Sequence, residues 1–386
     1  MRCRGESRQD SPLPRLNALQ ADPQTRMRFF FLSSHAHYAL DPGATRVSGG
    51  AELQVALLAK ELVDRGHEVV IAGGDTGQQD GRVFNGVVTR NAGRFHTGGM
   101  SDAVTALPKV AGLLAEYRPE YVCVLGWTAW LYILCLLRPI FGYKLVFICG
   151  LDTEIDGSFG KTHGWKGGLF ERGVAHSDFR FAMSEHQRGL FGRGGLSCGM
   201  YRNLILPRAN PRTATKDIDL LWVGRCQHIK RPHLFLDLVE RLPDTRCEMI
   251  CPREDEELWQ SVVARAAGIP NLTFHERVPY AEIQETYDRA RFLVSTSEAE
   301  GFPNVMIQAA QGAAGILSLE LDPDGLIETF GAGFSAGGDV ELFVAKTREL
   351  IAGSEISQRM GDGAQKMVSE WLDNAKNTEA FLEGLK

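Results

Sequence analysis

The chain has 386 residues, of which 44% are hydrophobic and 23% charged, a mixture typical of a globular protein with room for two domains. Its net charge of −6 argues against a general nucleic-acid-binding protein, because such proteins carry a basic face. No apolar run reaches the length of about eighteen residues that a transmembrane helix needs, and residues 1–26 lack the apolar segment of a signal peptide. We therefore expect a cytoplasmic protein whose ordered part begins at Met27, with residues 1–26 either a disordered tail or an over-called start.

The cysteines and histidines do not form the pattern of a metal site. The eight cysteines are scattered, and Cys247 and Cys251 are their only close pair. A zinc site needs a second pair or a histidine cluster, which the sequence lacks. His35 and His37 flank one alanine, and we interpret them as loop residues beside a cleft. The sequence predicts a reducing compartment, no disulfide framework and no metal.

The N-terminal half alternates short apolar runs with helical patterns. Strands are expected at residues 28–32, 68–72, 87–89, 121–125, 144–149 and 179–183. Helices are expected at residues 51–65, 100–117, 130–137 and 169–175, and from residue 184 onward. Two loops lie between them, a long one over residues 33–48 and a polar, glycine-rich one over residues 151–168. The alternation predicts a parallel sheet covered by helices on both faces.

The first strand–helix–strand unit lacks the Gly-x-Gly-x-x-Gly pattern of dinucleotide-binding enzymes, which argues against an NAD enzyme. Gly49 and Gly50 stand directly before its helix instead. A glycine pair leaves backbone N–H groups uncovered at a helix N-terminus, where a phosphate or a sugar can bind. An ordinary turn is the alternative interpretation of this pair.

A second half follows residues 203–216, whose proline, arginine, asparagine and threonine content predicts a linker. Strands are expected at residues 218–223, 247–251, 272–275, 292–294, 315–319 and 331–334. Helices are expected at residues 234–242, up to residue 267, at 280–290 and from residue 305, with two more before residue 386. This half is therefore predicted to be a second parallel α/β domain.

A basic pair lies at the first strand end of this half. Arg225 and Lys230 are five residues apart, between the strand at 218–223 and a helix that starts near Pro232. Two cations beside a helix N-terminus suit a diphosphate. An exposed basic turn is the alternative.

A carboxylate occupies another strand end. Glu300 follows the strand at 292–294, on a loop that Gly301 and Pro303 break before a helix starts at Val305. Open α/β sheets bind ligands at the carboxyl ends of their strands, and the free N–H groups of the new helix favour an anion. An ordinary corner with a solvated glutamate is the alternative.

The segment at residues 300–309, Glu-Gly-Phe-Pro-Asn-Val-Met-Ile-Gln-Ala, resembles the donor-binding motif of the retaining glycosyltransferases of family four. The segment Ser-Gly-Gly-Ala-Glu at residues 48–52 is similar to the opening of their N-terminal domain. The spacing of Arg225 and Lys230 is similar to that of their diphosphate-binding pair. The resemblance extends from about residue 27 to the end of the chain.

The chain also departs from this family at three places. Gln308 stands where the motif has its second glutamate, and Arg231 stands where glycine commonly follows the lysine. Residues 149–152, Cys-Gly-Leu-Asp, contain no histidine where many relatives have one. These departures leave open a nucleotide-sugar-binding protein that has lost turnover. A nucleotide-sugar epimerase on the same architecture is a third possibility.

The resemblance implies the α/β fold called GT-B, in which two doubly wound Rossmann-like domains face each other across a cleft. Residues 27–206 would form the acceptor-side domain and residues 207–365 the nucleotide-sugar-binding domain. Residues 366–386 would form a C-terminal helix that packs back on the N-terminal domain.

The resemblance further implies a retaining, hexosyltransferase-like enzyme that moves a sugar from a UDP- or GDP-sugar to an acceptor hydroxyl. Arg225, Lys230 and Glu300 would be catalytic: the two cations stabilise the departing diphosphate and the carboxylate orients the sugar. Donor binding would also involve Gly49, Gly50, Val278, Gly301, Phe302, Asn304 and Gln308. Val278 would present backbone groups to the base, and Gln308 would hold the ribose.

No cofactor and no metal are expected, because fixed cations would replace the metal at the diphosphate. The expected partners are a nucleotide-sugar donor and a glycan or lipid-linked acceptor in polysaccharide or glycolipid synthesis, and no nucleic acid. A lipid-linked acceptor would place the protein at the inner face of the membrane.

Overall fold

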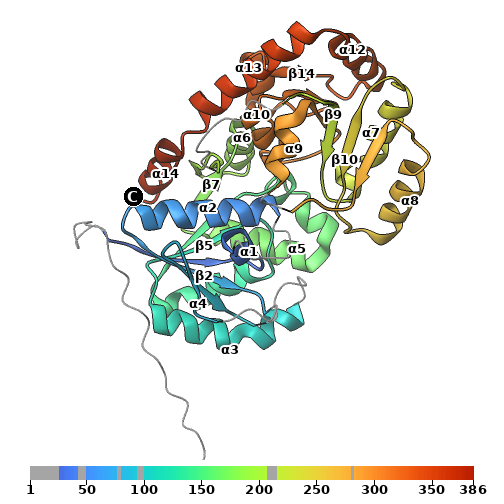
Figure 1. Ribbon diagram of the computed structural model, residues 1–386. Coiled ribbons are helices and arrows are strands. Elements are labelled where there is room, and N and C mark those ends of the chain that lie inside the picture. The colour runs from blue at the N-terminus through green and yellow to red at the C-terminus, as the bar shows by residue number, and fades with distance from the viewer. Residues whose placement is uncertain (1–25, 42–48, 76–79, 94–99, 207–214, 280–281) are drawn as a thin grey trace, which may run out of the picture.

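The computed structural model describes residues 26–41, 49–75, 80–93, 100–206, 215–279 and 282–386 (Figure 1). The expected tail over residues 1–26 lies outside this part of the chain, apart from Arg26, and so does the segment 207–214 of the expected linker. The described chain forms two layered α/β halves, each built on its own sheet.

The N-terminal sheet has eight strands. Their order across the sheet is β3 (Val83–Phe84), β4 (Val87–Asn91), β2 (Glu68–Gly73), β1 (Arg28–Leu32), β5 (Tyr121–Leu125), β6 (Lys144–Ile148), β7 (Phe179–Ala182) and β8 (Gly199–Met200). All neighbours are parallel except β3 and β4. Strands β3 and β8 were not predicted, because two residues carry no periodic signal.

Both faces of this sheet are buried, as the apolar run in β1 predicts. Phe30 packs with residues of α3 (Met100–Tyr117), α4 (Trp130–Phe141), α5 (Phe159–His176) and α6 (Glu185–Arg193). Phe29 and Phe31 point to the opposite face and pack with α2 (Gly50–Asp64) and α14 (Asn374–Glu383). Successive strand residues alternate between the two faces, so one run of phenylalanines serves both cores.

The C-terminal sheet has six parallel strands. Their order is β11 (Leu272–His275), β10 (Cys247–Ile250), β9 (Ile218–Val223), β12 (Ala290–Ser295), β13 (Gly315–Ser318) and β14 (Gly333–Ser335). One face packs against α7 (Pro232–Glu240), α8 (Glu256–Ala266) and α12 (Val340–Ala352). The other packs against α9 (Ile283–Arg289), α10 (Asn304–Gln311), α11 (Leu326–Thr329) and α13 (Ser354–Trp371). This is the predicted doubly covered α/β arrangement.

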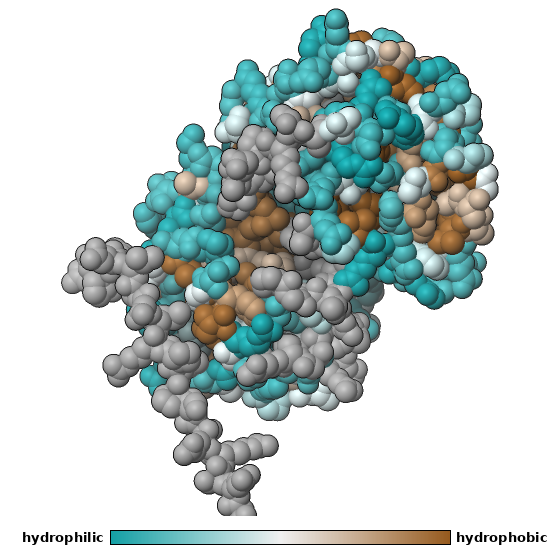
Figure 2. Space-filling view, in the orientation of Figure 1, coloured by the Kyte–Doolittle hydropathy of each residue, from teal (hydrophilic) through white to brown (hydrophobic). Residues whose placement is uncertain are grey.

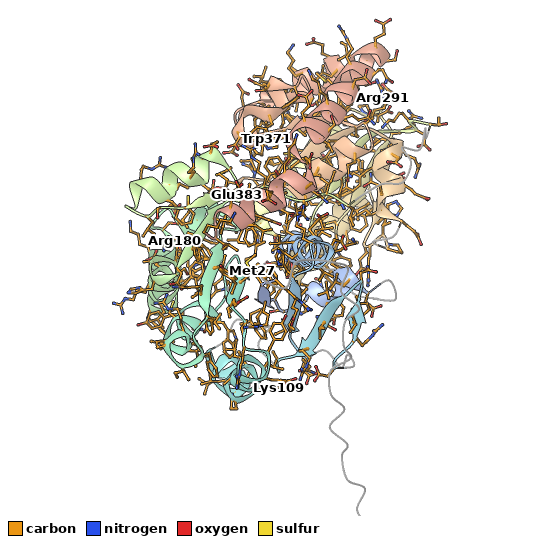
Figure 3. The ribbon with its side chains drawn as sticks, turned by 90° about the vertical axis from the view of Figure 1, so that its left-hand side faces the viewer. Met27, Lys109, Arg180, Arg291, Trp371 and Glu383 are labelled. Atoms are coloured by element: carbon orange, nitrogen blue, oxygen red, sulfur yellow. The ribbon has the colours of Figure 1, made fainter. Side chains whose placement is uncertain are left out.

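The chain crosses between the halves twice, and the two crossings touch. The guanidinium of Arg202 lies 3.6 Å from the ring centre of Trp371. The Asn374 side chain binds both backbone polar groups of Ile205, at 2.8 and 2.9 Å. Helix α13 runs along the C-terminal half, whereas α14 lies against the N-terminal half (Figures 1 and 3), where the ring of Phe381 is 4.8 Å from that of Phe181.

Several predicted boundaries were wrong for identifiable reasons. Helix α5 begins at Phe159 and not near residue 169, because a polar, glycine-rich sequence hides a helix that Gly164 interrupts at φ 58°. Helix α4 continues through Pro139 to Phe141, where Gly142 caps it in the left-handed conformation. The expected loop at 33–48 contains α1 (Ala36–Leu40), which carries the buried His37.

Two further errors concern the last helices and the segment between the halves. Three helices rather than two follow β14, namely α12, α13 and α14. Residues 203–206 do not behave as a linker, because Asn203 and Leu204 are buried and the backbone of Leu204 is bound by the side chain of Gln54. Composition predicts a linker there, but tertiary hydrogen bonds incorporate these residues into the fold.

In the space-filling view the surface is largely hydrophilic, with hydrophobic residues exposed in separate small areas (Figure 2). None of the described helices has the length and apolar content to cross a membrane.

Candidate functional site

A cavity of about 670 Å³ lies between the two halves and is lined by residues of both. Its walls are the segments that follow parallel strands, because the carboxyl ends of the strands in each sheet meet at one edge. All of the residues predicted to bind the donor or to act in catalysis line this cavity: Gly49, Gly50, Arg225, Lys230, Val278, Glu300, Gly301, Phe302, Asn304 and Gln308. His35, expected beside a cleft, lines it as well.

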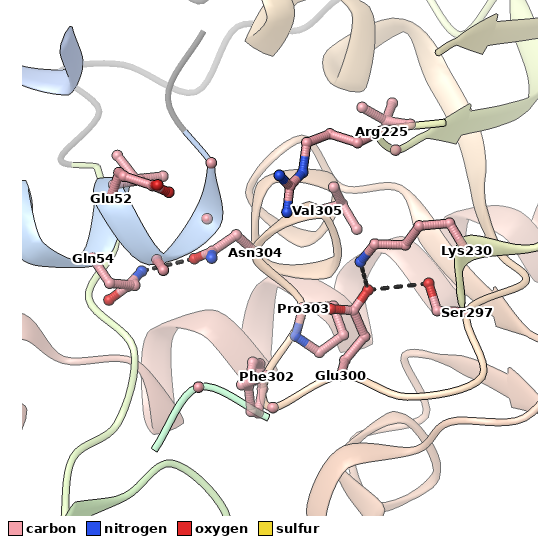
Figure 4. Close-up of a pocket in the computed structure, with 18 of the residues that line it drawn as sticks. Glu52, Gln54, Arg225, Lys230, Ser297, Glu300, Phe302, Pro303, Asn304 and Val305 are labelled. Carbon is pink, nitrogen blue, oxygen red and sulfur yellow. Dashed lines mark hydrogen bonds and ion pairs between the residues drawn. The ribbon is translucent and has the colours of Figure 1, made fainter. Parts of the chain in front are cut away.

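Lys230 and Glu300 form an ion pair inside the cavity (Figure 4). Their side chains are only 19% and 14% exposed, and the hydroxyl of Ser297 donates a hydrogen bond to Glu300 Oε1 at 3.0 Å. A carboxylate thus holds the ammonium group in place and neutralises its charge. An anionic ligand with more charge than one carboxylate could compete for this cation.

Arg225 is paired in the same way with a residue that the sequence did not single out. Its guanidinium lies 3.0 Å from Glu254 Oε2, and Gln227 Nε2 donates to Glu254 Oε1 at 2.5 Å. Glu254 follows β10, the strand next to β9, so it reaches the same edge of the sheet as Arg225. The usable signal in the sequence was its place just after a predicted strand.

The loop that carries Lys230 accommodates an arginine, Arg231, at the position where the family commonly has glycine. The φ angle of Arg231, 48°, lies in the left-handed region, which residues other than glycine rarely adopt. The side chain offsets this strain by donating to the carbonyl of Thr296 at 2.7 Å and to Glu320 at 2.6 Å. Thr296 in turn donates to the carbonyl of Lys230 at 2.7 Å. These bonds hold the Lys230 loop against the end of β12.

The N-terminal wall is organised around a buried carboxylate, Glu154, which is 3% exposed. It accepts hydrogen bonds from the backbone N–H groups of Trp127 at 2.8 Å and Gly150 at 2.7 Å, and so ties the loops after β5 and β6 together. Burial raises the pKa of Glu154 to about 7, although these backbone N–H groups act in the opposite direction. Nothing in the local sequence indicates that this residue of a polar loop is buried.

Two glycines of the predicted site allow the halves to touch. A Cβ atom on Gly301 would clash with the carbonyl oxygen of Gly150, which belongs to the segment that lacks the family's histidine. A Cβ atom on Gly50 would lie 2.5 Å from Asn304 Nδ2. The Glu300 loop therefore approaches the Gly150 backbone so closely that glycine is needed at residue 301, and the Asn304 side chain lies against the N-terminus of α2.

The remaining predicted residues have different surroundings. Phe302 is 7% exposed and its ring belongs to the hydrophobic core beneath α10, so its side chain supports the loop. Val278 packs against the same core at the cavity edge. Gln308 lines the cavity from α10, and its backbone carbonyl accepts a hydrogen bond from Gln284 Nε2 at 3.0 Å.

No group of three or more histidine, cysteine, aspartate or glutamate side chains among the described residues is placed to hold a metal ion. The described site offers a ligand three lysine or arginine cations, Arg225, Lys230 and Arg253, on one wall, and helix N-termini without side-chain caps on both walls. Gly49 and Pro303, the residues that precede α2 and α10, make no side-chain capping bond. This combination suits a phosphorylated ligand.

Two family models match the sequence. Residues 49–197 match the "Glycosyl transferase 4-like domain" and residues 207–367 match "Glycosyl transferases group 1". Among curated proteins no match was found.

Solved structures match over nearly the whole chain. A sucrose-phosphate synthase from Thermosynechococcus elongatus superposes with a TM-score of 0.74 at 14% identity, over 93% of this chain and 98% of the other. A trehalose-6-phosphate synthase, OtsA, gives 0.71 at 11% identity over 93% and 98%. HepE from Anabaena, solved in complex with UDP, gives 0.67 at 15% identity over 93% and 99%. At such identities the likeness concerns the fold, and that fold is GT-B.

Proposed function

Since the chain belongs to the group 1 glycosyltransferases, we propose that it transfers a sugar from a nucleotide diphosphate donor to an acceptor hydroxyl, with retention of the anomeric configuration. The family resemblance supports a UDP- or GDP-sugar as donor and a glycan or lipid-linked sugar as acceptor, in polysaccharide or glycolipid synthesis. A lipid-linked acceptor would bring the enzyme to the cytoplasmic face of a membrane.

The observation that carries this proposal is the convergence of Arg225 and Lys230 on one cavity. Both follow β9, both line the cavity, and each is neutralised by a carboxylate, Glu254 or Glu300. A diphosphate brings more negative charge than either carboxylate, so it can replace them as the partner of both cations. The two cations and two carboxylates balance each other, so a bound diphosphate would add negative charge beside the displaced carboxylates.

The chemistry follows from where negative charge develops. When the bond between the sugar and the diphosphate breaks, the electron pair goes to the β-phosphate oxygen, and fixed cations stabilise it most in that state. Lys230 and Arg225 would supply these cations. Glu300, released from Lys230, would accept hydrogen bonds from sugar hydroxyls and orient the ring. The acceptor hydroxyl would enter from the N-terminal wall, and its proton would leave with the phosphate.

We assign binding of the ribose to the Gln308 side chain and binding of the base to the backbone around Val278, as the resemblance implies. Both residues line the donor wall of the cavity. An amide can accept from one ribose hydroxyl and donate to the other, so ribose binding does not require the family's second glutamate. A nucleotide-sugar-binding protein without turnover would use the same contacts, and activity measurements distinguish the two.

The direct test is a thermal-shift comparison of UDP, GDP, UMP and GMP on the wild type, Arg225→Ala and Lys230→Ala. A ligand at a hundred times its Kd stabilises the folded state by about 2.7 kcal/mol, so the diphosphate of the correct nucleotide should raise Tm by several degrees. The monophosphate should raise it less, and both variants should lose most of the difference. Arg241→Ala is the matched control, because Arg241 pairs with Glu341 outside the cavity. Equal shifts in all four proteins would place the anion site elsewhere.

A further inference from the structure

Three amide side chains join the Glu300 loop to the N-terminal half. Gln54 Nε2 donates to Asn304 Oδ1 at 2.7 Å (Figure 4). Asn203 Nδ2 donates to the same oxygen at 3.2 Å and to the carbonyl of Phe302 at 3.1 Å. Gln54 belongs to α2 and Asn203 lies where the chain leaves the N-terminal half, whereas Asn304 opens α10. We call Gln54, Asn203 and Asn304 the amide bridge.

The backbone fixes which way these amides point. Gln54 Oε1 accepts from the backbone N–H of Leu204 at 2.7 Å, and Gln54 Nε2 donates to the carbonyl of Leu204 at 2.9 Å. A backbone N–H can only donate and a carbonyl can only accept, so the Gln54 amide has one possible orientation. Its second Nε2 hydrogen therefore requires an acceptor, and Asn304 must present its oxygen.

Asn304 is thereby committed to the contact between the halves. Its Oδ1 accepts two hydrogen bonds, one from Gln54 and one from Asn203, and its Nδ2 lies against Gly50. A carbonyl oxygen has two lone pairs, so no acceptor capacity is left for a donor sugar. The resemblance assigned Asn304 to donor binding, which stays a prediction for its Nδ2 group, whereas its Oδ1 atom joins the two halves.

Burial shows that the contact is part of the folded structure. Gln54 and Asn203 are each 1% exposed, and buried amides are costly to leave without partners. Gln54 also accepts from the Tyr201 hydroxyl at 3.1 Å, which completes its bonding. The Gln54 side chain is thus held by Tyr201 and Leu204, and the backbone carbonyl of Asn203 accepts from Asn377 Nδ2 at 3.3 Å. The position of the Glu300 loop relative to α2 follows from these donors.

We propose that the amide bridge of Gln54, Asn203 and Asn304 positions the Glu300 loop against the N-terminus of α2. It would thereby set the spacing between the cavity wall of the C-terminal half, which would bind the donor, and that of the N-terminal half, which would bind the acceptor. These are positioning residues, because they act through Glu300 and the α2 N-terminus. The catalytic consequence rests on the proposed transferase function. The proposed diphosphate and ribose contacts, Arg225, Lys230 and Gln308, all belong to the C-terminal half, so the bridge should affect turnover more than nucleotide affinity.

The test compares Asn304→Ala, which removes the acceptor, with Asn304→Asp, which keeps it. Asn271→Ala is the matched control, because the Asn271 amide donates to two carbonyls, those of Leu242 and Thr245, inside the C-terminal half. Small-angle X-ray scattering measures the separation of the halves without any ligand. Calorimetric titration measures the Kd of the nucleotide diphosphate, and sugar transfer gives kcat.

For Asn304→Ala we expect a larger radius of gyration, a Kd within twofold of the wild type and a kcat at least tenfold lower. Asn304→Asp should restore the radius of gyration, and Asn271→Ala should leave all three values unchanged. An unchanged radius of gyration in Asn304→Ala would overturn the proposal. So would a Kd raised tenfold with an unchanged radius, because Asn304 would then contact the donor. Scattering needs no substrate, so it decides on the bridge even if the protein transfers no sugar.

Discussion

The pairing of Arg225 with Glu254 leads to a prediction in which removing a cavity carboxylate improves ligand binding. Diphosphate binding at Arg225 must break this pair, in which the two side chains are 52% and 38% exposed. An exposed pair of this kind contributes about 0.2–1 kcal/mol. Glu254 would also repel the bound ligand by about 0.6 kcal/mol per phosphate charge at about 7 Å in water. Glu254→Gln should remove both terms while keeping an oxygen for Gln227.

Together these terms amount to about 1–1.5 kcal/mol, which corresponds to a five- to tenfold lower Kd for the nucleotide diphosphate. Calorimetric titration at low and high ionic strength measures this difference in Kd between Glu254→Gln and the wild type. Salt should reduce the difference, because it screens exposed charges. Glu257→Gln makes the same charge change on the exposed side of α8, outside the cavity lining, and serves as control.

Two results would refute the reasoning about Glu254. If both variants bind the nucleotide diphosphate equally well, Arg225 does not contact the diphosphate. If Glu254→Gln binds it more weakly than the wild type, Glu254 contacts the donor itself.

Three further predictions follow from other residues of the cavity. Gln308→Glu should tighten donor binding several-fold, by about 1 kcal/mol, because charge-assisted hydrogen bonds to ribose are stronger than neutral ones. Gln308→Ala should weaken donor binding. Equal affinities of the three proteins in a calorimetric titration would show that Gln308 does not contact the ribose. Because burial raises the pKa of Glu154 from 4.5 to about 7, the folded state holds this proton more tightly than the unfolded state, and it loses stability as the pH rises from about 4.5 through 7. The Tm of the wild type relative to Glu154→Gln should therefore fall between pH 5 and pH 8, by the equivalent of up to about 3 kcal/mol, and parallel pH profiles would contradict this. Gly301→Ala should lower kcat at least tenfold in a transfer assay, since its Cβ would clash with the carbonyl of Gly150, and wild-type kinetics would show that the halves do not meet there in the working enzyme.

The elements that the sequence predicted best are short apolar runs between turn signals. The bounds of β1, β5, β9 and β11 agree with the prediction to the residue. Helix α5 was missed over its first ten residues because its sequence is polar and rich in glycine. Tertiary contacts stabilise the first turn of α5, since the ring centre of Phe159 lies 5.0 Å from that of Trp127 and 4.9 Å from that of Phe170.

The candidate site shows the same division between local and distant signals. Arg225, Lys230 and Glu300 were found because each lies at a strand end, which a local pattern reveals. The amide bridge was not found, because Gln54 and Asn304 are 250 residues apart and neither stands in a pattern that names its partner. Local sequence predicts the walls of the cavity, whereas the bonds that place one wall against the other depend on the packed structure.

The central claim is sugar transfer driven by a departing nucleotide diphosphate, and product analysis tests it most directly. The measurement is nuclear magnetic resonance of the reaction with the tightest-binding nucleotide sugar and a panel of glycan and lipid-linked acceptors, for the wild type and Lys230→Ala. We predict acceptor-dependent release of the nucleotide diphosphate, a glycoside with the anomeric configuration of the donor, and at least a tenfold loss of rate in Lys230→Ala. A free sugar of altered configuration, or a bound donor that is never turned over with any acceptor, would contradict the account.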